Sequence, residues 1–202
     1  VTLVYFALTA WRPSVMNLPL TVAATLVILV LGLAPSETAR EIVRKPWVAG
    51  RFVYANQIIG RDVPALEVKS ELPVLSKNGF LATHPFIPEN LRKPEKKWER
   101  LEAGRLISIA ACSSCHSLTD TGIRPIAKYF PAEADAASIN DWLSAGLYRG
   151  HIVYMPPLPL PELDRDVMSE FLAEIISVQK TDPQRAANYA VKGFPKDSVG
   201  GK

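Results

Sequence analysis

The sequence predicts a mainly α protein, in which an N-terminal transmembrane helix is followed by one small all-α domain. Three observations support this fold class. Apolar residues crowd into the first 34 positions of the 202-residue chain. Between residues 163 and 178, apolar residues recur on one face at helical spacing. The length allows one domain of ordinary size, which leaves roughly a hundred residues for an anchor, a connector and a tail.

The first 35 residues are expected to form a membrane anchor with one full span. Residues 18–35 carry no charged side chain and are near the minimum length for crossing a hydrocarbon core of about 30 Å at about 1.5 Å per residue. Residues 1–11 are also apolar but too few to span alone, and they suit the tail of an earlier span. A cleaved signal peptide is the alternative, although the basic start that such a peptide needs is missing.

Residues 36–94 are interpreted as an extended juxtamembrane connector with short helices, because prolines and charges are scattered through them. Three positive charges, Arg40, Arg44 and Lys45, follow the span, and the positive-inside rule would place them in the cytoplasm. Charge is segregated along the chain: residues 36–105 carry 13 Lys/Arg against 9 Asp/Glu, whereas residues 106–180 carry 5 against 9. No basic stripe with interleaved aromatic residues stands out, so a nucleic-acid partner is not expected.

Residues 95–179 are expected to fold as a helical domain. A helix over residues 96–111 leads into a pair of cysteines, and a short helix begins near Ser138. The last helix spans about residues 163–178. The remaining residues, 180–202, are polar and contain Gly and Pro, so the sequence predicts a flexible surface tail that only a partner would order.

The chemistry is concentrated in the motif Cys112-Ser113-Ser114-Cys115-His116. C-x-x-C-H is the attachment signature of c-type haem, because two cysteines at this spacing can reach two vinyl groups on one porphyrin edge while the histidine lies under the iron. A thioredoxin-like redox pair would need a βαβ unit around the motif. A structural zinc site would need two further soft ligands that the chain barely has. The motif uses both cysteines of the chain, so a disulfide framework is not expected.

A low-spin electron-transfer haem needs a sixth ligand, and a methionine thioether raises its reduction potential. Met155 stands in a proline-rich loop 39 residues after the motif histidine, where the prolines would hold its sulfur in place. Met168 lies on the apolar face of the last helix, where a core role is expected, and Met16 lies in the membrane region. His151 is the competing sixth ligand, and His84 is interpreted as an ordinary polar residue.

Several spaced features around the motif resemble a class I cytochrome c domain of the short bacterial type, over residues 95–178. Gly104 stands eight residues before Cys112, as the family's first-helix glycine does. The loop Met155-Pro156-Pro157 resembles the family's ligand loop running into the C-terminal helix, and Phe171 suits the aromatic that packs on the first helix. Ser108 is a departure, because many members carry an aromatic residue there.

The resemblance implies one covalent haem c and a role for each matching residue. Cys112 and Cys115 would form the thioethers, with His116 as the proximal and Met155 as the distal iron ligand. Pro125 matches the family proline whose carbonyl accepts a hydrogen bond from the proximal imidazole, and it would orient that ring.

A second resemblance concerns the segment after the span. Residues 39–60, AREIVRKPWVAGRFVYANQIIG, look like the end of the quinol-oxidising subunit of cytochrome bd-type oxidases, where a comparable Arg-rich, Pro-aromatic segment follows a helix. This resemblance implies that the chain is a subunit of a larger, quinol-linked complex.

These expectations combine into a membrane-tethered monohaem c-type cytochrome that passes single electrons between a respiratory or photosynthetic membrane complex and another redox carrier protein. It would lie in the inner (plasma) membrane, in contact with lipid. Its haem domain would face the periplasm, because c-type haem is attached outside the cytoplasm, and we weigh this chemistry above the positive-inside rule. Two alternatives remain open: a haem enzyme with an open or displaceable sixth position, and a mainly structural subunit of such a complex.

Overall fold

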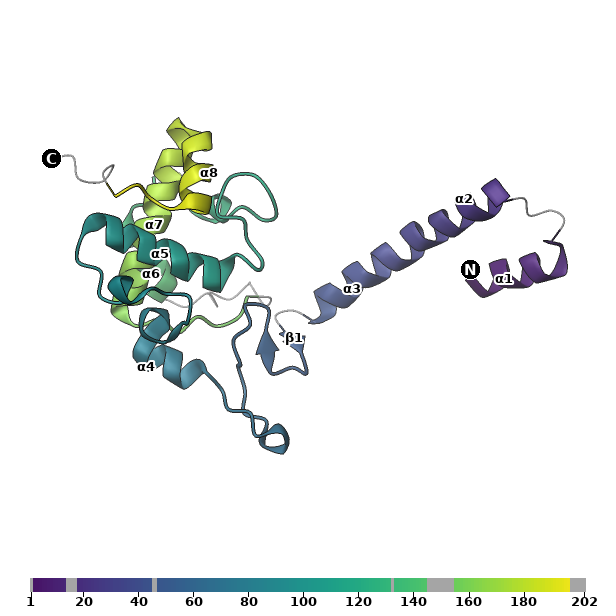
Figure 1. The fold of residues 1–202 in the computed structure, drawn as a ribbon, viewed down its shortest axis with the longest axis horizontal. Coiled ribbons are helices and arrows are strands. Elements are labelled where there is room, and N and C mark those ends of the chain that lie inside the picture. Colours follow the sequence, from purple (N-terminus) through teal and green to yellow (C-terminus); the bar gives the residue numbers. More distant parts are fainter. Residues whose placement is uncertain (1, 14–17, 45–46, 132, 145–154, 197–202) are drawn as a thin grey trace. The chain divides into compact units, whose positions relative to one another are not determined.

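The computed structural model describes residues 2–13, 18–44, 47–131, 133–144 and 155–196. The chain divides into two compact units, Val1–Lys45 and Pro46–Lys202. Helices dominate both units (Figure 1), so the mainly α character predicted from the sequence is confirmed.

The first unit consists of helices. Helix α1 spans Thr2–Trp11, and a continuous helical stretch follows, made of α2 (Leu18–Ile28), a π-helical turn (Leu29–Leu33) and α3 (Ala34–Arg44). Within this stretch, Val22–Arg40 is a helix of 19 residues that is long and apolar enough to cross a membrane, and none of it is buried inside the protein. The span predicted over residues 18–35 overlaps most of this helix.

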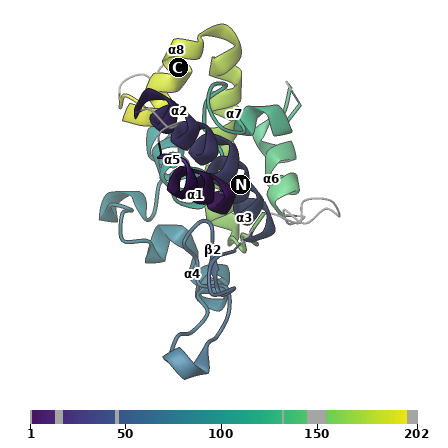
Figure 2. The ribbon, with the colours of Figure 1, turned by 90° about the vertical axis from the view of Figure 1, so that its right-hand side faces the viewer.

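The second unit places a small antiparallel hairpin ahead of a cluster of helices. The hairpin pairs β1 (Trp47–Ala49) with β2 (Val53–Tyr54). The α-helices that follow are α4 (Leu72–Thr83), α5 (Lys97–Cys112), α6 (Ala136–Ser144), α7 (Glu162–Thr181) and α8 (Pro183–Lys192). Short 3-10 helices lie at Pro64–Leu66, Glu89–Leu91 and Ile126–Tyr129. Helix α7 packs against α5, α6 and α8; α6 lies near its beginning, where Asn140 donates to Asp166, and α8 folds back at its end (Figure 2).

Helices α5 and α7 approach closely at Gly104. A Cβ atom at this position would lie only 2.0 Å from the carbonyl oxygen of Val167 and 2.8 Å from Cβ of Phe171, so a side chain does not fit there. Phe171 is fully buried, and the glycine and the aromatic residue that were expected at this helix contact do meet. Ser108 is also fully buried, and its hydroxyl has no hydrogen-bond partner among the described residues. Arg100 on α5 forms an ion pair with Glu170 on α7 at 2.6 Å.

Residues 47–94 belong to the same compact unit as the helices, which differs from the extended connector that the sequence suggested. Leu75, Phe80 and Leu81 join the hydrophobic core. Helix α4 is broken at Gly79, whose φ of +76° lies in the left-handed region. Beyond the break, the carboxylate of Asp164 accepts hydrogen bonds from the backbone N–H groups of Phe80 and Leu81, at 2.5 and 3.3 Å. Turns and prolines space the buried residues irregularly, which hides them from an analysis of periodicity.

The expected flexible tail, residues 180–202, contains helix α8 and also packs on the core. Ala186, Tyr189 and Ala190 are buried, at the spacing of one helix face. After the helix, the buried ring of Phe194 lies 4.5 Å from the ring of Tyr189 and 6.1 Å from the ring of Phe171, between centroids. Small alanines make this helix face apolar, so the sequence contains no run of large hydrophobic residues that would have revealed it.

Candidate functional site

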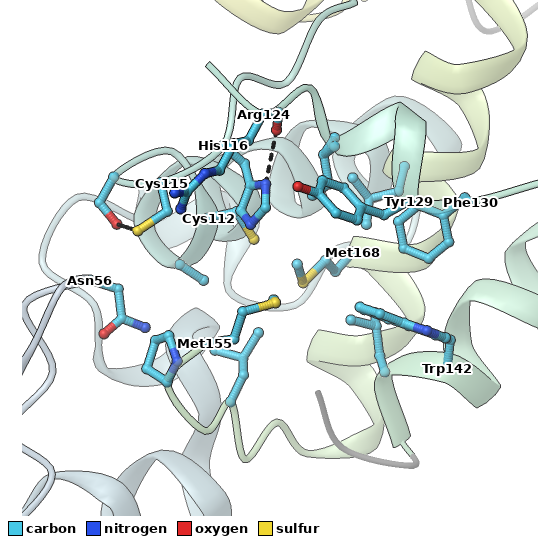
Figure 3. A pocket seen from close by; sticks show the side chains of 17 residues that line it. Asn56, Cys112, Cys115, His116, Arg124, Tyr129, Phe130, Trp142, Met155 and Met168 are labelled. Carbon is cyan, nitrogen blue, oxygen red and sulfur yellow. Dashed lines mark hydrogen bonds between the residues drawn. The ribbon is translucent and has the colours of Figure 1, made fainter. Parts of the chain in front are cut away.

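A cavity of about 240 Å³ lies in the second unit, beside the C-terminal end of α5. Cys112, Cys115, His116 and Met155, four of the five residues predicted to bind a cofactor, all line it. Helices α6 and α7 and the Ile126–Tyr129 turn contribute apolar and aromatic side chains to its walls. Figure 3 shows the imidazole of His116 and the thioether of Met155 approaching the same space from different parts of the chain.

The motif follows the end of helix α5 in a tight turn. Helix α5 ends at Cys112, and the carbonyl of that residue accepts hydrogen bonds from the backbone N–H groups of Cys115 and His116, at 3.0 and 2.9 Å. Both cysteines are free and only partly exposed. The turn therefore presents the two thiols and the imidazole to one cavity.

The pKa of Cys112 distinguishes this site from the site of a reactive dithiol. Burial, and then the neighbouring Cys115, raise the pKa of the Cys112 thiol to about 12. The attacking cysteines of dithiol oxidoreductases have a lowered pKa, because the thiolate is their nucleophile. Cys112 stays protonated at neutral pH, and this disfavours the thioredoxin-like alternative.

The ring of His116 is held by a backbone carbonyl. Its Nδ1 lies 2.9 Å from the carbonyl oxygen of Arg124, and its ring meets the ring of Tyr129 edge-on at 5.2 Å between centroids. In the tautomer with a proton on Nδ1, this bond leaves the lone pair of Nε2 free to bind a metal.

The residue that holds the imidazole is the one before the predicted Pro125. Arg124 has a φ of +46°, which lets its carbonyl turn toward the ring. Pro125 is buried but does not line the cavity, and its own carbonyl accepts a hydrogen bond from the backbone N–H of Lys128 at 3.1 Å. The acceptor predicted from the resemblance, the carbonyl of Pro125, is therefore wrong, because the imidazole bonds to the carbonyl of Arg124.

Two methionines line the cavity. Met155 is partly buried and stands beside the buried Pro156, whereas Met168 is 1% exposed and projects from helix α7. Figure 3 shows both side chains reaching into the space below His116. The core role predicted for Met168 fits its burial, and its side chain also contributes to the wall of the cavity.

The remaining candidates lie away from this cavity or outside the described residues. His84 follows the last residue of helix α4, and its ring lies 5.7 Å from the ring of Phe80 and 5.6 Å from that of Phe86, between centroids. Burial lowers the pKa of His84. Met16 and His151 lie outside the described residues.

Sequence reasoning missed two kinds of lining residue. Asn56 comes from the hairpin segment, which was expected to be a separate connector. Tyr129, Phe130 and Trp142 supply aromatic walls, and the rings of Phe130 and Trp142 meet edge-on at 5.0 Å between centroids. The aromatic residues that follow the Cys112–His116 motif would have been a usable signal, whereas nothing in the sequence marks Asn56.

The donor set of the cavity fits a covalently held haem. The two thiols stand at the end of one helix, the imidazole is oriented through Nδ1, and a thioether faces the same space. The aliphatic and aromatic walls suit a large apolar ring and limit the access of water.

Within the described part of the chain, no group of three or more His, Cys, Asp or Glu side chains is placed to hold a metal ion. No protein-family model, curated protein or solved structure matches the chain.

Proposed function

We propose that this chain is a membrane-anchored monohaem c-type cytochrome, which carries single electrons as a subunit of a respiratory or photosynthetic membrane complex. The observation that carries the proposal is the convergence of Cys112, Cys115, His116 and Met155 on one largely apolar cavity. A haem bound there would supply one-electron chemistry through its iron.

Each of these residues has a defined task in the proposal. Cys112 and Cys115 hold the ring covalently through two thioether bonds. His116 binds the iron through Nε2, and its hydrogen bond to the carbonyl of Arg124 fixes the tautomer and the orientation of the imidazole. Met155 would supply a further iron ligand with its neutral sulfur, a ligand type that favours the reduced state.

The first unit supports the membrane anchor. Val22–Arg40 is long and apolar enough to span a bilayer. An anchor would keep the electron carrier at a high effective concentration near the other subunits of a membrane complex, which the second resemblance suggests to be quinol-linked. Because c-type haem is attached outside the cytoplasm, the proposal places the second unit in the periplasm, next to the inner membrane and within reach of a soluble redox carrier.

The lining of the cavity favours an electron carrier over a haem enzyme. General acid–base chemistry on a bound substrate needs a titratable group beside the reacting atoms. Among the described residues, the titratable side chains of the lining are those of Cys112, Cys115, His116, Arg124 and Tyr129. These described lining residues include no carboxylate and no second histidine, and Met155 reaches into the space that a substrate would need.

Near-infrared absorption of the full chain in detergent tests the axial ligation. The sulfur-to-iron band of the oxidised protein should disappear in Met155→Ala and persist in Met168→Leu, because the second substitution removes the other cavity methionine with little change in volume. Loss of the band in Met168→Leu alone would assign the ligand to α7 instead. A high-spin spectrum of the parent protein that shifts on adding cyanide would favour the enzyme alternative.

A further inference from the structure

Asn56 brings a polar side chain from the hairpin segment into the cavity. The side chain is only 7% exposed and lines the same space as His116 and Met155, while the neighbouring Gln57 is exposed. Asn56 also lies well before residue 95, where the haem domain was expected to begin. The segment that follows the membrane helix therefore forms part of the cavity wall.

The turn that carries Asn56 is held by backbone hydrogen bonds and aromatic stacking. The N–H of Tyr54 donates to the carbonyl of Ile58, and the N–H of Gln57 donates to the carbonyl of Tyr54, both at 2.9 Å. Tyr54 is buried and stacks on Trp47 at 4.1 Å between ring centroids. The position of Asn56 is thus set by the fold of the hairpin.

The side-chain oxygen of Asn56 is hydrogen-bonded within the described residues, whereas its side-chain nitrogen is not. Its Oδ1 accepts a hydrogen bond from the backbone N–H of Ile58 at 3.4 Å, which assigns the oxygen to the turn. Its Nδ2 has no hydrogen-bond partner among the described residues. Figure 3 shows this nitrogen on the side of the amide that faces Met155. Because Asn56 lines the cavity, this N–H is available to an acceptor on a group bound there.

We propose that Asn56 is a positioning residue for the bound haem, and that its amide N–H donates a hydrogen bond to an acceptor on the Met155 side of the cavity. This inference rests on the function proposed above. The acceptor is an electron-rich atom, either the sulfur of Met155 or a carboxylate of the haem. In both cases the hydrogen bond withdraws electron density and favours the reduced state, so the hairpin segment raises the reduction potential.

The test is a spectroelectrochemical titration of the full-length holoprotein in detergent, with Asn56→Leu and Asn56→Asp. Asn56→Leu removes the donor. Asn56→Asp keeps an oxygen for the N–H of Ile58, removes the donor and adds a negative charge. At the solution potential at which the parent protein is half reduced, we expect Asn56→Leu to be mostly oxidised and Asn56→Asp to be more oxidised still.

Asn78→Leu is the matched control, because Asn78 is exposed on helix α4 of the same unit, and it should stay half reduced. Half reduction of both Asn56 variants at that potential would overturn the inference and leave Asn56 a role in the turn alone. If Asn56→Leu does not fold, Asn56→Ala takes its place, since it also lacks the donor and adds no charge.

Two further readouts make the result specific. Where the potential falls, a shift of the near-infrared band in Asn56→Leu identifies the sulfur of Met155 as the acceptor, and an unchanged band identifies a haem carboxylate. Absence of covalent haem from the parent protein would refute the proposed function itself, and a haem-loaded parent with unchanged Asn56 variants would refute only this inference.

Discussion

The carboxylate of Asp164 lies 2.5 Å from the backbone nitrogen of Phe80, a residue 84 positions earlier in the chain. This bond ties the beginning of α7 to the second part of α4, and α7 also carries Met168 into the cavity. Burial raises the pKa of the Asp164 carboxyl to about 6, against the opposing effect of hydrogen bonds from Phe80 and Leu81. The segment that carries α4 is therefore fastened to the helix that lines the site.

Stability should depend on pH through Asp164. The folded protein binds this proton more tightly than the unfolded chain, whose carboxyl has an ordinary pKa near 3.8. The contribution of Asp164 to the free energy of unfolding is therefore fully present below pH 3.8 and is lost as the pH rises through about 6. The loss amounts to about 3 kcal/mol at most. Urea unfolding between pH 4 and pH 7 should show this loss in the parent protein and not in Asp164→Asn.

Asp141→Asn provides the control for this titration, since Asp141 is exposed on α6. It should reproduce the pH dependence of the parent protein. The same pH dependence in Asp164→Asn as in the parent would show that Asp164 does not titrate in this range.

Gly79→Ala should destabilise the second unit. The backbone at Gly79 is in the left-handed region, and an added Cβ would lie 2.5 Å from both carboxylate oxygens of Asp164. Strain of this kind costs about 1–3 kcal/mol, and displacement of the carboxylate would add to it. Urea unfolding should therefore give a free energy of unfolding at least about 2 kcal/mol below that of Asn78→Ala, a substitution at an exposed neighbouring position. Equal stability of the two variants would argue against the contact between Gly79 and Asp164.

Ser108→Ala should stabilise the protein. The hydroxyl of Ser108 is buried between helices without a hydrogen-bond partner among the described residues, and alanine is the better helix former. Removing an unsatisfied hydroxyl should raise the free energy of unfolding by about 1 kcal/mol, which thermal or urea unfolding can measure. Ser113→Ala is a useful comparison, because the hydroxyl of Ser113 is exposed and donates to the carbonyl of Ile109. A loss of stability in Ser108→Ala would mean that its hydroxyl has a partner.

Phe194→Ala should destabilise the protein although residue 194 lies in the segment expected to be a tail. Its ring is 8% exposed and packs on Tyr189 and Phe171. Truncation of a buried phenylalanine costs about 3–5 kcal/mol, and the position near a chain end favours the lower value. Val191→Ala on the same segment should cost little, because Val191 is 75% exposed. Equal unfolding curves for the two variants would show that the segment does not contribute to the core.

The main helices and the motif could be predicted from the sequence because their signals are local. The helix expected over residues 96–111 is α5, Lys97–Cys112, and the one expected near residues 163–178 is α7, Glu162–Thr181. Gly104 and Phe171 meet as expected, since a glycine and an aromatic residue at those positions leave room for a close helix contact.

Long-range contacts could not be predicted. Asn56 reaches the cavity through a turn set by tertiary packing, and Asp164 caps a helix 84 positions earlier in the chain. The imidazole bonds to the carbonyl of Arg124 instead of that of Pro125. Arg124 has a left-handed backbone conformation, which a residue other than glycine rarely adopts and which the sequence does not indicate. Helix α8 was not predicted, because its buried face is made largely of alanine.

The covalent attachment of haem is the most direct test of the account. The full chain, produced in a host that matures c-type cytochromes, should be analysed on a denaturing gel stained for haem. The account predicts a stained band near 22 kDa, its loss in the double variant Cys112→Ser, Cys115→Ser, and its persistence in Met155→Ala. An unstained band from the parent protein, with the chain intact and folded, would contradict the assignment as a c-type cytochrome.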